Sequence, residues 1–242
     1  RLACHDVEVS GIGSLIHCFN DPMHKSTMTK SSMLRVTEIF HSIQGESSYA
    51  GQPCVFVRLT GCPLRCTWCD TDYAFYGGNE CSIDEVLAKV HTYGCRLVEV
   101  TGGEPLVQPE SLPLMTRLCD AGYTVLLETS GAVDIAPVDP RAHVILDVKC
   151  PGSGMTDRMH WPNLSQLAAK DEAKFVLADR ADYDCAREIH AQYDIASRCM
   201  VLFSPVFGAL DACQLAEWIL ADCLPVRFQL QMHKFIWTPT AR

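Results

Sequence analysis

Three cysteines in one short segment have the spacing of an inorganic cluster site. Cys62, Cys66 and Cys69 lie in GCPLRCTWCD, a C-x3-C-x2-C pattern. Three thiolates from one loop could bind three corners of a cubic [4Fe–4S] cluster and leave the fourth iron open to a small molecule. A zinc ion would need a fourth cysteine or histidine nearby. Cys81 is the nearest candidate and its spacing fits poorly, so the cluster is favoured over zinc or unligated core cysteines.

A second segment with the composition of a ligand site is TGGEP, residues 101–105. Its two glycines allow backbone carbonyls to approach a ligand closely, and Glu104 adds an anion that could attract an ammonium group. Two further polar segments, ETSG at 128–131 and DVKCPGSG at 147–154, follow later β-rich runs. Taken alone, TGGEP could be a tight turn and Lys149 a surface charge.

The elements that must position these segments alternate along the chain. Six β-rich runs are predicted as strands, at residues 54–60, 96–103, 124–131, 143–149, 174–179 and 200–205. Helical patterns lie between several of them, at residues 82–94, 111–122, 182–193 and 209–223. Ser82 and Glu85 have the spacing of a capping box. This alternation predicts an α/β fold with a parallel sheet, either an open partial barrel or a doubly wound sheet. Both build ligand sites at the carboxyl ends of their strands.

Composition narrows the class of protein. The chain has 242 residues, 48% of them apolar, and a formal net charge of −9, so it is a poor candidate for binding bulk nucleic acid. It has no run of about 18 apolar residues that would predict a membrane span and no recognisable export signal. We therefore expect a cytoplasmic protein, whose 14 cysteines serve as buried apolar residues, metal ligands or redox groups.

The first part of the chain differs from the rest. Residues 1–32 show no helical or strand period, whereas a folded pattern begins at Met33. We expect residues 1–32 to be a poorly ordered N-terminal extension, with a mobile native arm as the alternative. Residues 33–242 are expected to form one domain.

With these motifs the chain resembles the radical S-adenosylmethionine (SAM) superfamily, in which the three-cysteine loop follows the first strand and an aromatic residue, here Trp68, precedes the third cysteine. Within it, EIFHSIQGES at 38–47 closely resembles a segment of the 7-carboxy-7-deazaguanine synthases. The similarity continues through residues 50–75 and through QLQMHKFIW at 229–237. Ser47, where many members have glycine, and Asp147-Val148, where many have Ser-Pro, depart from the pattern.

The resemblance implies a radical SAM core, a partial barrel of about six parallel strands. It implies a lyase of queuosine biosynthesis that converts 6-carboxy-5,6,7,8-tetrahydropterin to 7-carboxy-7-deazaguanine. A 5′-deoxyadenosyl radical abstracts hydrogen from C6 of the pterin, the ring contracts and ammonia leaves. The implied cofactors are a [4Fe–4S] cluster, SAM and Mg²⁺. The implied partners are a flavodoxin-type electron donor and a second copy of the chain.

The resemblance also implies which residues form the site. The cluster ligands are Cys62, Cys66 and Cys69, and Thr71 contacts Mg²⁺. The SAM contacts are Trp68, Gly102, Gly103, Glu104, Glu128, Ser130 and Lys149. The substrate contacts are Ile43, Gln44, Gly45, Glu46, Arg58 and Thr101. His233 and Lys234 either help to close the site or are exposed charges on a last strand.

Two other functions stay open at this level. A radical SAM activating enzyme, which installs a glycyl radical on a partner protein, would share the cysteine loop and the fold but would lack SIQGE. A zinc-binding module without enzymatic activity would contain zinc without iron or sulfide.

Overall fold

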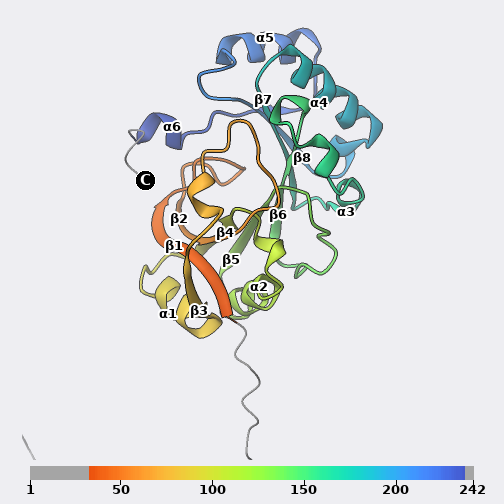
Figure 1. The fold of residues 1–242 in the computed structure, drawn as a ribbon. Helices are drawn as coiled ribbons and strands as arrows, with labels where there is room; N and C mark the ends of the chain where they lie inside the picture. Colours follow the sequence, from red (N-terminus) through yellow and green to blue (C-terminus); the bar gives the residue numbers. More distant parts are fainter. Residues whose placement is uncertain (1–32, 238–242) are drawn as a thin grey trace, which may run out of the picture. The chain divides into compact units, whose positions relative to one another are not determined.

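A nine-stranded sheet runs through residues 33–237, the part of the chain that the computed structural model describes (Figure 1). Its strand order is β3-β1-β2-β4-β5-β6-β7-β8-β9. The strands are β1 (Met33–Ile43), β2 (Pro53–Leu59), β3 (Asn79–Ser82), β4 (Leu97–Gly102), β5 (Thr124–Thr129), β6 (His143–Val148), β7 (Glu172–Leu177), β8 (Met200–Pro205) and β9 (Arg227–Phe228). The expected extension over residues 1–32 lies outside the described residues.

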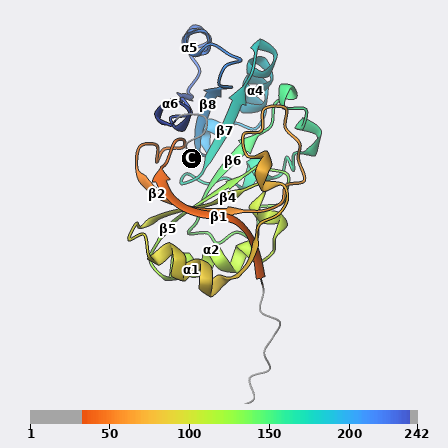
Figure 2. The same ribbon diagram turned by 60° about the vertical axis from the view of Figure 1, so that its left-hand side comes forward.

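The sheet is parallel from β2 to β9 and antiparallel at one edge. Each neighbouring pair from β2 and β4 through to β8 and β9 is parallel, whereas β1 pairs antiparallel with both β2 and β3. All six predicted strands are confirmed, each end within two residues. The open, curved sheet is the predicted partial barrel rather than the doubly wound alternative (Figure 2). The sequence did not identify β3 and β9, because runs of four and two residues carry too little periodicity.

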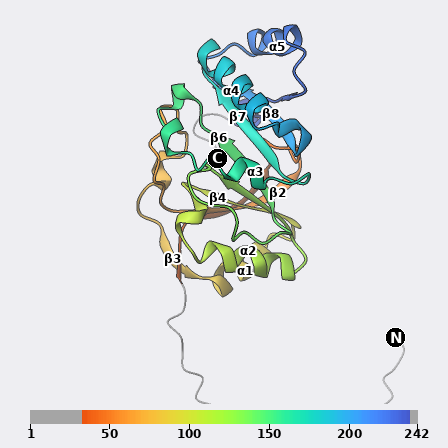
Figure 3. The ribbon, with the colours of Figure 1, turned by 90° about the vertical axis from the view of Figure 1, so that its right-hand side faces the viewer.

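Helices pack along the outside of the sheet (Figure 3). They are α1 (Ile83–His91), α2 (Ser111–Asp120), α3 (Asn163–Gln166), α4 (Arg180–Gln192) and α5 (Ala212–Ala221), whereas a last short helix, α6 (His233–Ile236), lies apart from this layer, beside Gly45 and Asp70. Single 3-10 turns lie at Asp72–Ala74, Pro105–Val107, Pro151–Ser153, Thr156–Arg158 and Ile195–Ser197. The capping box of α1 is confirmed: the Glu85 backbone N–H donates to Ser82 Oγ (3.3 Å), and the Ser82 N–H donates to Glu85 Oε2 (2.7 Å). None of the helices in the described residues is long and apolar enough to span a membrane.

The outer face of the sheet holds the main apolar core. Val57, Val100, Leu127, Leu146 and Phe175, from five successive parallel strands, belong to one buried cluster. The helices add Val86, Leu118, Tyr183 and Leu215 to the same cluster. Burial of this face fixes which side of each strand faces inward, because side chains alternate across a strand.

The inner face of the sheet is apolar toward the amino ends of the parallel strands and charged toward their carboxyl ends. The apolar part is a small cluster of Cys54, Phe56, Leu97, Leu126 and Ile145. Two or four residues further along the same strands, the alternation places polar side chains on this face. They are Arg58, Glu99, Thr101, Glu128, Asp147 and Lys149, and Lys174 of β7 lies in register with Asp147. The fold therefore directs a row of charges into the barrel at the carboxyl ends of the strands.

Candidate functional site

The cysteine loop follows β2 and carries its three thiols free and half-buried. Leu64 anchors the loop, since its side chain is 1% exposed and its N–H donates to Cys62 Sγ at 3.4 Å. On the far side of the loop, the Thr67 N–H donates to the Ser153 carbonyl oxygen at 3.1 Å. These contacts hold the middle of the loop, between Cys62 and Cys69.

The chemistry of the three thiols fits a cluster. Burial raises the pKa of Cys62, Cys66 and Cys69, and charge repulsion from neighbouring cysteines raises those of Cys62 and Cys66 further. The nearby Lys149 ammonium favours the thiolates of Cys66 and Cys69. Within residues 33–237 no three His, Cys, Asp or Glu side chains gather as ligands of a single metal ion. A cubic cluster binds each cysteine through a different iron, so its sulfurs need not converge on one point. Metal binding would deprotonate the thiols.

The glycine segment after β4 packs directly against the cysteine loop. The Gly103 N–H donates to the Leu59 carbonyl oxygen (3.2 Å), and the Glu104 N–H donates to the Gly61 carbonyl oxygen (2.8 Å). A Cβ on Gly103 would lie 2.2 Å from the Gly61 oxygen, and one on Gly102 would lie 2.1 Å from the Leu59 oxygen. Gly102 also has φ +142°, outside the range of most side-chain-bearing residues. Both glycines are therefore required by this backbone contact.

Glu104 joins the glycine segment to the end of β5. Its carboxylate is fully buried and accepts hydrogen bonds from Leu106 N–H (3.0 Å), Thr129 Oγ1 (2.8 Å) and Ser130 N–H (2.7 Å). Burial raises the pKa of Glu104 although these donors favour the carboxylate. Two predicted SAM contacts, Glu104 and Ser130, are thus in direct contact with each other.

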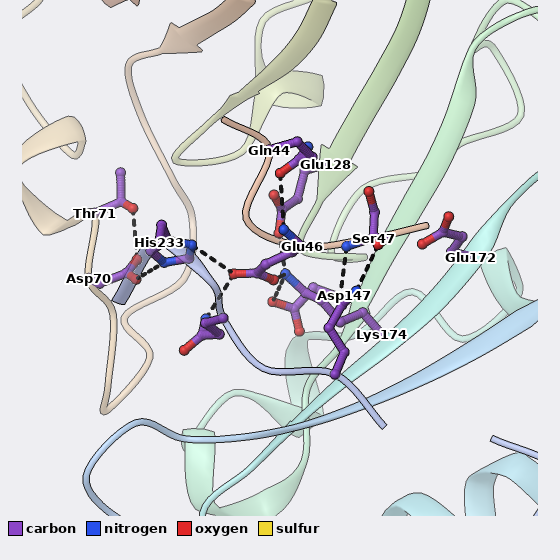
Figure 4. Close-up of polar contacts among 12 residues, drawn as sticks. Gln44, Glu46, Ser47, Asp70, Thr71, Glu128, Asp147, Glu172, Lys174 and His233 are labelled. Atoms are coloured by element: carbon purple, nitrogen blue, oxygen red, sulfur yellow. Dashed lines mark hydrogen bonds and ion pairs between the residues drawn. The ribbon is translucent and has the colours of Figure 1, made fainter. Parts of the chain in front are cut away.

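Lys174 is the centre of a charge cluster on the inner face (Figure 4). Its side chain is buried, and Nζ lies 2.5 Å from Glu46 Oε2, contacts Glu128 Oε1 and lies 3.8 Å from Asp147 Oδ2. Asp147 also pairs with Lys149 at 2.8 Å. Burial opposes the charges of Lys174, Glu46 and Asp147. The pairing nevertheless raises the pKa of Lys174 well above its usual value and lowers those of Glu46 and Asp147.

Glu99 is the exception in this cluster. Burial and the neighbouring Glu128 charge raise its pKa well above the usual value, although Gln44 and Lys174 favour its ionised form. Gln44 Nε2 donates to Glu99 Oε2, and Gln44 Oε1 accepts the Glu46 N–H at 3.2 Å. Both ends of the Gln44 amide are therefore engaged within the protein, where they fix the loop that carries Glu46.

The C-terminal segment folds back over this loop. The Met232 N–H donates to the Gly45 oxygen (2.9 Å), and Gln231 Nε2 donates to Glu46 Oε1 (2.9 Å). Gln229 Oε1 accepts the Ser47 N–H (2.8 Å). Ser47 has φ +64°, in the left-handed region that favours glycine, so the bond to Gln229 helps to hold a serine in that conformation.

His233 and Lys234 lie in α6, so the alternative of exposed charges on a last strand is wrong. Lys234 Nζ is 2.5 Å and His233 Nε2 is 3.8 Å from Asp70 Oδ2, next to the cysteine loop. Thr71 Oγ1 donates to Asp70 Oδ1 at 2.9 Å (Figure 4). α6 therefore joins the Glu46 loop to the residue that follows Cys69.

The other predicted residues lie on β1, on β2 and β4, and in the cysteine loop. Arg58 Nε donates to Glu38 Oε1 at 2.9 Å, and Arg58 lies in register with Thr101 on the neighbouring strand. Ile43 ends β1, opposite Pro53, and Trp68 is half-buried in the cysteine loop.

Sequence reasoning missed several residues of this site: Glu99, Glu172, Lys174, Gln229 and Gln231. Glu172 accepts the Ser48 N–H at 2.9 Å. The signal was present for three of them, because Glu99, Glu172 and Lys174 are charges in mostly apolar strands whose residues are buried. Buried charges are rare unless they are paired.

The chain matches known proteins over most of its length. Residues 56–148 match the family model "Radical SAM superfamily". The 7-carboxy-7-deazaguanine synthase of Chlorobaculum tepidum is 48% identical over 219 residues, 89% of this chain and 99% of that protein. The enzyme of the same name from Koribacter versatilis is 49% identical over 224 residues, 86% of this chain and 99% of that protein.

Among solved structures, QueE from Escherichia coli has a similar fold. The TM-score is 0.69 at 24% identity, and the match covers 83% of this chain and 95% of that chain. At this identity the likeness bears on the fold alone.

Proposed function

Because the chain belongs to the 7-carboxy-7-deazaguanine synthase family of the radical SAM superfamily, we propose that it contracts the ring of 6-carboxy-5,6,7,8-tetrahydropterin to 7-carboxy-7-deazaguanine with loss of ammonia. The observation that carries the proposal is the contact between two loops. The three-cysteine loop packs backbone to backbone on the glycine segment, at the mouth of a barrel lined with charges. A cluster and SAM are the cofactors of this superfamily.

Cys62, Cys66 and Cys69 would hold the [4Fe–4S] cluster. Bound there, the reduced cluster would supply one electron for cleavage of the S–C5′ bond of SAM, which gives methionine and a 5′-deoxyadenosyl radical. Lys149 would favour the thiolates of Cys66 and Cys69 by its charge. Leu64 and the backbone contacts of the loop keep the three sulfurs in place.

The SAM wall would be formed by Trp68, Gly102, Gly103, Glu104, Glu128, Ser130 and Lys149. The Glu104 carboxylate is already satisfied by Leu106, Thr129 and Ser130. The SAM ammonium would therefore be received by backbone carbonyls of the glycine segment, which Glu104 holds in position. Glu128, whose side chain is 26% exposed, is accessible to ribose hydroxyls.

The pterin wall would be formed by Ile43, Gln44, Gly45, Glu46, Arg58 and Thr101. Glu46 is held ionised by Lys174 and can accept hydrogen bonds from the N–H groups of the pterin. Gln44 would act by fixing the Glu46 loop. Arg58 could exchange part of its contact with Glu38 for the substrate carboxylate, a bidentate partner for guanidinium.

The proposal includes a Mg²⁺ ion that Thr71 contacts. Mg²⁺ takes few protein ligands together with water and substrate oxygens. One hydroxyl and the substrate carboxylate would suffice. Asp70, which holds the Thr71 hydroxyl, is occupied by His233 and Lys234 and would orient Thr71 rather than bind the ion.

The proposed partners are a flavodoxin-type protein that reduces the cluster and a second copy of the chain in a homodimer. The alternative function, an activating enzyme for a glycyl-radical protein, is not favoured, since the relatives at 48–49% identity are 7-carboxy-7-deazaguanine synthases.

The proposal is tested by an anaerobic assay with 6-carboxytetrahydropterin, SAM, Mg²⁺ and a chemical reductant. We expect 7-carboxy-7-deazaguanine and ammonia in equal amounts from the wild type and neither from Cys66→Ala. Cys95→Ala is the matched control, a half-buried cysteine outside the loop, and should keep both products. Product from Cys66→Ala, or SAM cleavage without ring contraction in the wild type, would contradict the proposal.

A further inference from the structure

One buried ammonium group is shared by carboxylates from different walls of the site. Lys174 Nζ lies 2.5 Å from Glu46 Oε2, on the loop after β1, and contacts Glu128 Oε1 at the end of β5. Lys174 itself is 2% exposed, so no solvent replaces a contact that either carboxylate gives up. The strength of the contact between Lys174 and one carboxylate therefore depends on what the other carboxylate binds.

The two carboxylates are held unequally. Glu46 accepts a second bond from Gln231 and lies 3.9 Å from His233 Nδ1. The side chain of Glu128 is 26% exposed, against 12% for Glu46. Glu128 is thus the more accessible of the two, and a ligand with hydroxyl donors can bind it directly.

We infer that Lys174 is a positioning residue that couples the two ligand sites: binding of SAM beside Glu128 strengthens the hold of Lys174 on Glu46, and so tightens binding of the pterin. The inference rests on the proposed function. Hydroxyl groups that donate to Glu128 spread its negative charge and weaken its attraction for Lys174. The ammonium then pairs more fully with Glu46 and fixes that carboxylate in the orientation that the pterin requires.

Coupling between two sites is reciprocal, so bound pterin must tighten SAM by the same factor. Typical coupling between binding sites changes affinity by about 5- to 150-fold. We expect a factor in this range for the wild type, because the shared ammonium contacts both carboxylates directly.

The test uses the full chain with its cluster assembled and left oxidised, so that no turnover occurs during titration. The dissociation constant of SAM is measured by calorimetry with and without saturating 6-carboxytetrahydropterin. We expect pterin to tighten SAM at least fivefold in the wild type and less than twofold in Lys174→Met. Lys174→Arg, which keeps the charge, should restore part of the coupling. The matched control is Lys170→Met, which removes a lysine of the segment before β7 that pairs with Asp171, and it should keep the full factor.

Each outcome separates the inference from the function on which it rests. Full coupling in Lys174→Met, or none in the wild type, would overturn the positioning role even if the wild type forms product when reduced. Failure of the wild type to form product would overturn the function instead. If Lys174→Met does not fold, Glu128→Gln decides: this variant keeps the Lys174–Glu46 pair and should bind SAM with coupling below twofold, and full coupling there would overturn the inference.

Discussion

The cofactor side of the site is held by backbone contacts, whereas the substrate side is held by charges from distant segments. On the cofactor side, Gly103 N–H and Glu104 N–H bond to carbonyls of Leu59 and Gly61. On the substrate side, Glu46 is held by Lys174 and Gln231, 128 and 185 residues away in the sequence. The first side should therefore be sensitive to added atoms and the second to changes of charge.

Of the two glycine changes, the one on the cofactor side should have the larger effect. In Gly103→Ala the new Cβ would lie 2.2 Å from the Gly61 oxygen and 2.8 Å from Cys62 Cβ, and backbone cannot move aside as a side chain can. Overpacking typically costs about 1–3 kcal/mol, and we expect the upper end here. Iron and sulfide per chain after anaerobic reconstitution should fall several-fold. A full cluster in this variant would show that the loop contact is not required.

A smaller effect is expected from the matching change on the substrate side. In Gly45→Ala the new Cβ would lie 2.4 Å from His233 Nδ1, a ring atom that can rotate away, and 3.0 Å from the His233 backbone nitrogen, so α6 would have to shift by a few tenths of an ångström. We expect the pterin to bind about 5- to 30-fold more weakly, a cost of about 1–2 kcal/mol. Cluster content, measured by iron analysis, should be unchanged. Loss of the cluster in Gly45→Ala would show that the two sides are not separable.

A third expected effect concerns the dependence of stability on pH. The raised pKa of Glu99 means that the folded protein keeps a proton that the unfolded chain releases above about pH 4.5. This group therefore lowers stability as pH rises from about 4.5 toward its folded pKa, by about 1.4 kcal/mol per pH unit. Glu99→Gln has no carboxyl group to titrate at this position, so its free energy of unfolding should rise relative to that of the wild type as pH increases above about 4.5.

Urea unfolding of the wild type and Glu99→Gln at several pH values between 4.5 and 7 measures this difference. Glu188→Gln, a change at an exposed position on α4, is the control and should show a constant difference. A constant difference for Glu99→Gln as well would mean that Glu99 is ionised in the folded protein.

The fold and the cofactor side were readable from the sequence because their determinants are local. The capping box of α1, the six central strands and the cysteine and glycine segments each lie within a few residues. The substrate side was read only in part. Glu46 and Arg58 stood out through a resemblance, but Lys174, Glu99 and Gln229 acquire their roles from contacts made across the sheet. No spacing rule links Ser47 to Gln229, 182 residues away.

The division of the site into two walls is tested most directly by Arg58→Ala, titrated separately with 6-carboxytetrahydropterin and with SAM under anaerobic conditions. Truncating one partner of a buried charge pair costs about 2–5 kcal/mol, so the pterin should bind about 30-fold to several-thousand-fold more weakly. SAM should bind within twofold of the wild type. The control is Arg117→Ala, which removes a surface ion pair with Asp84 and should leave both affinities unchanged. If Arg58→Ala binds the pterin normally but loses SAM, the assignment of the two walls is wrong.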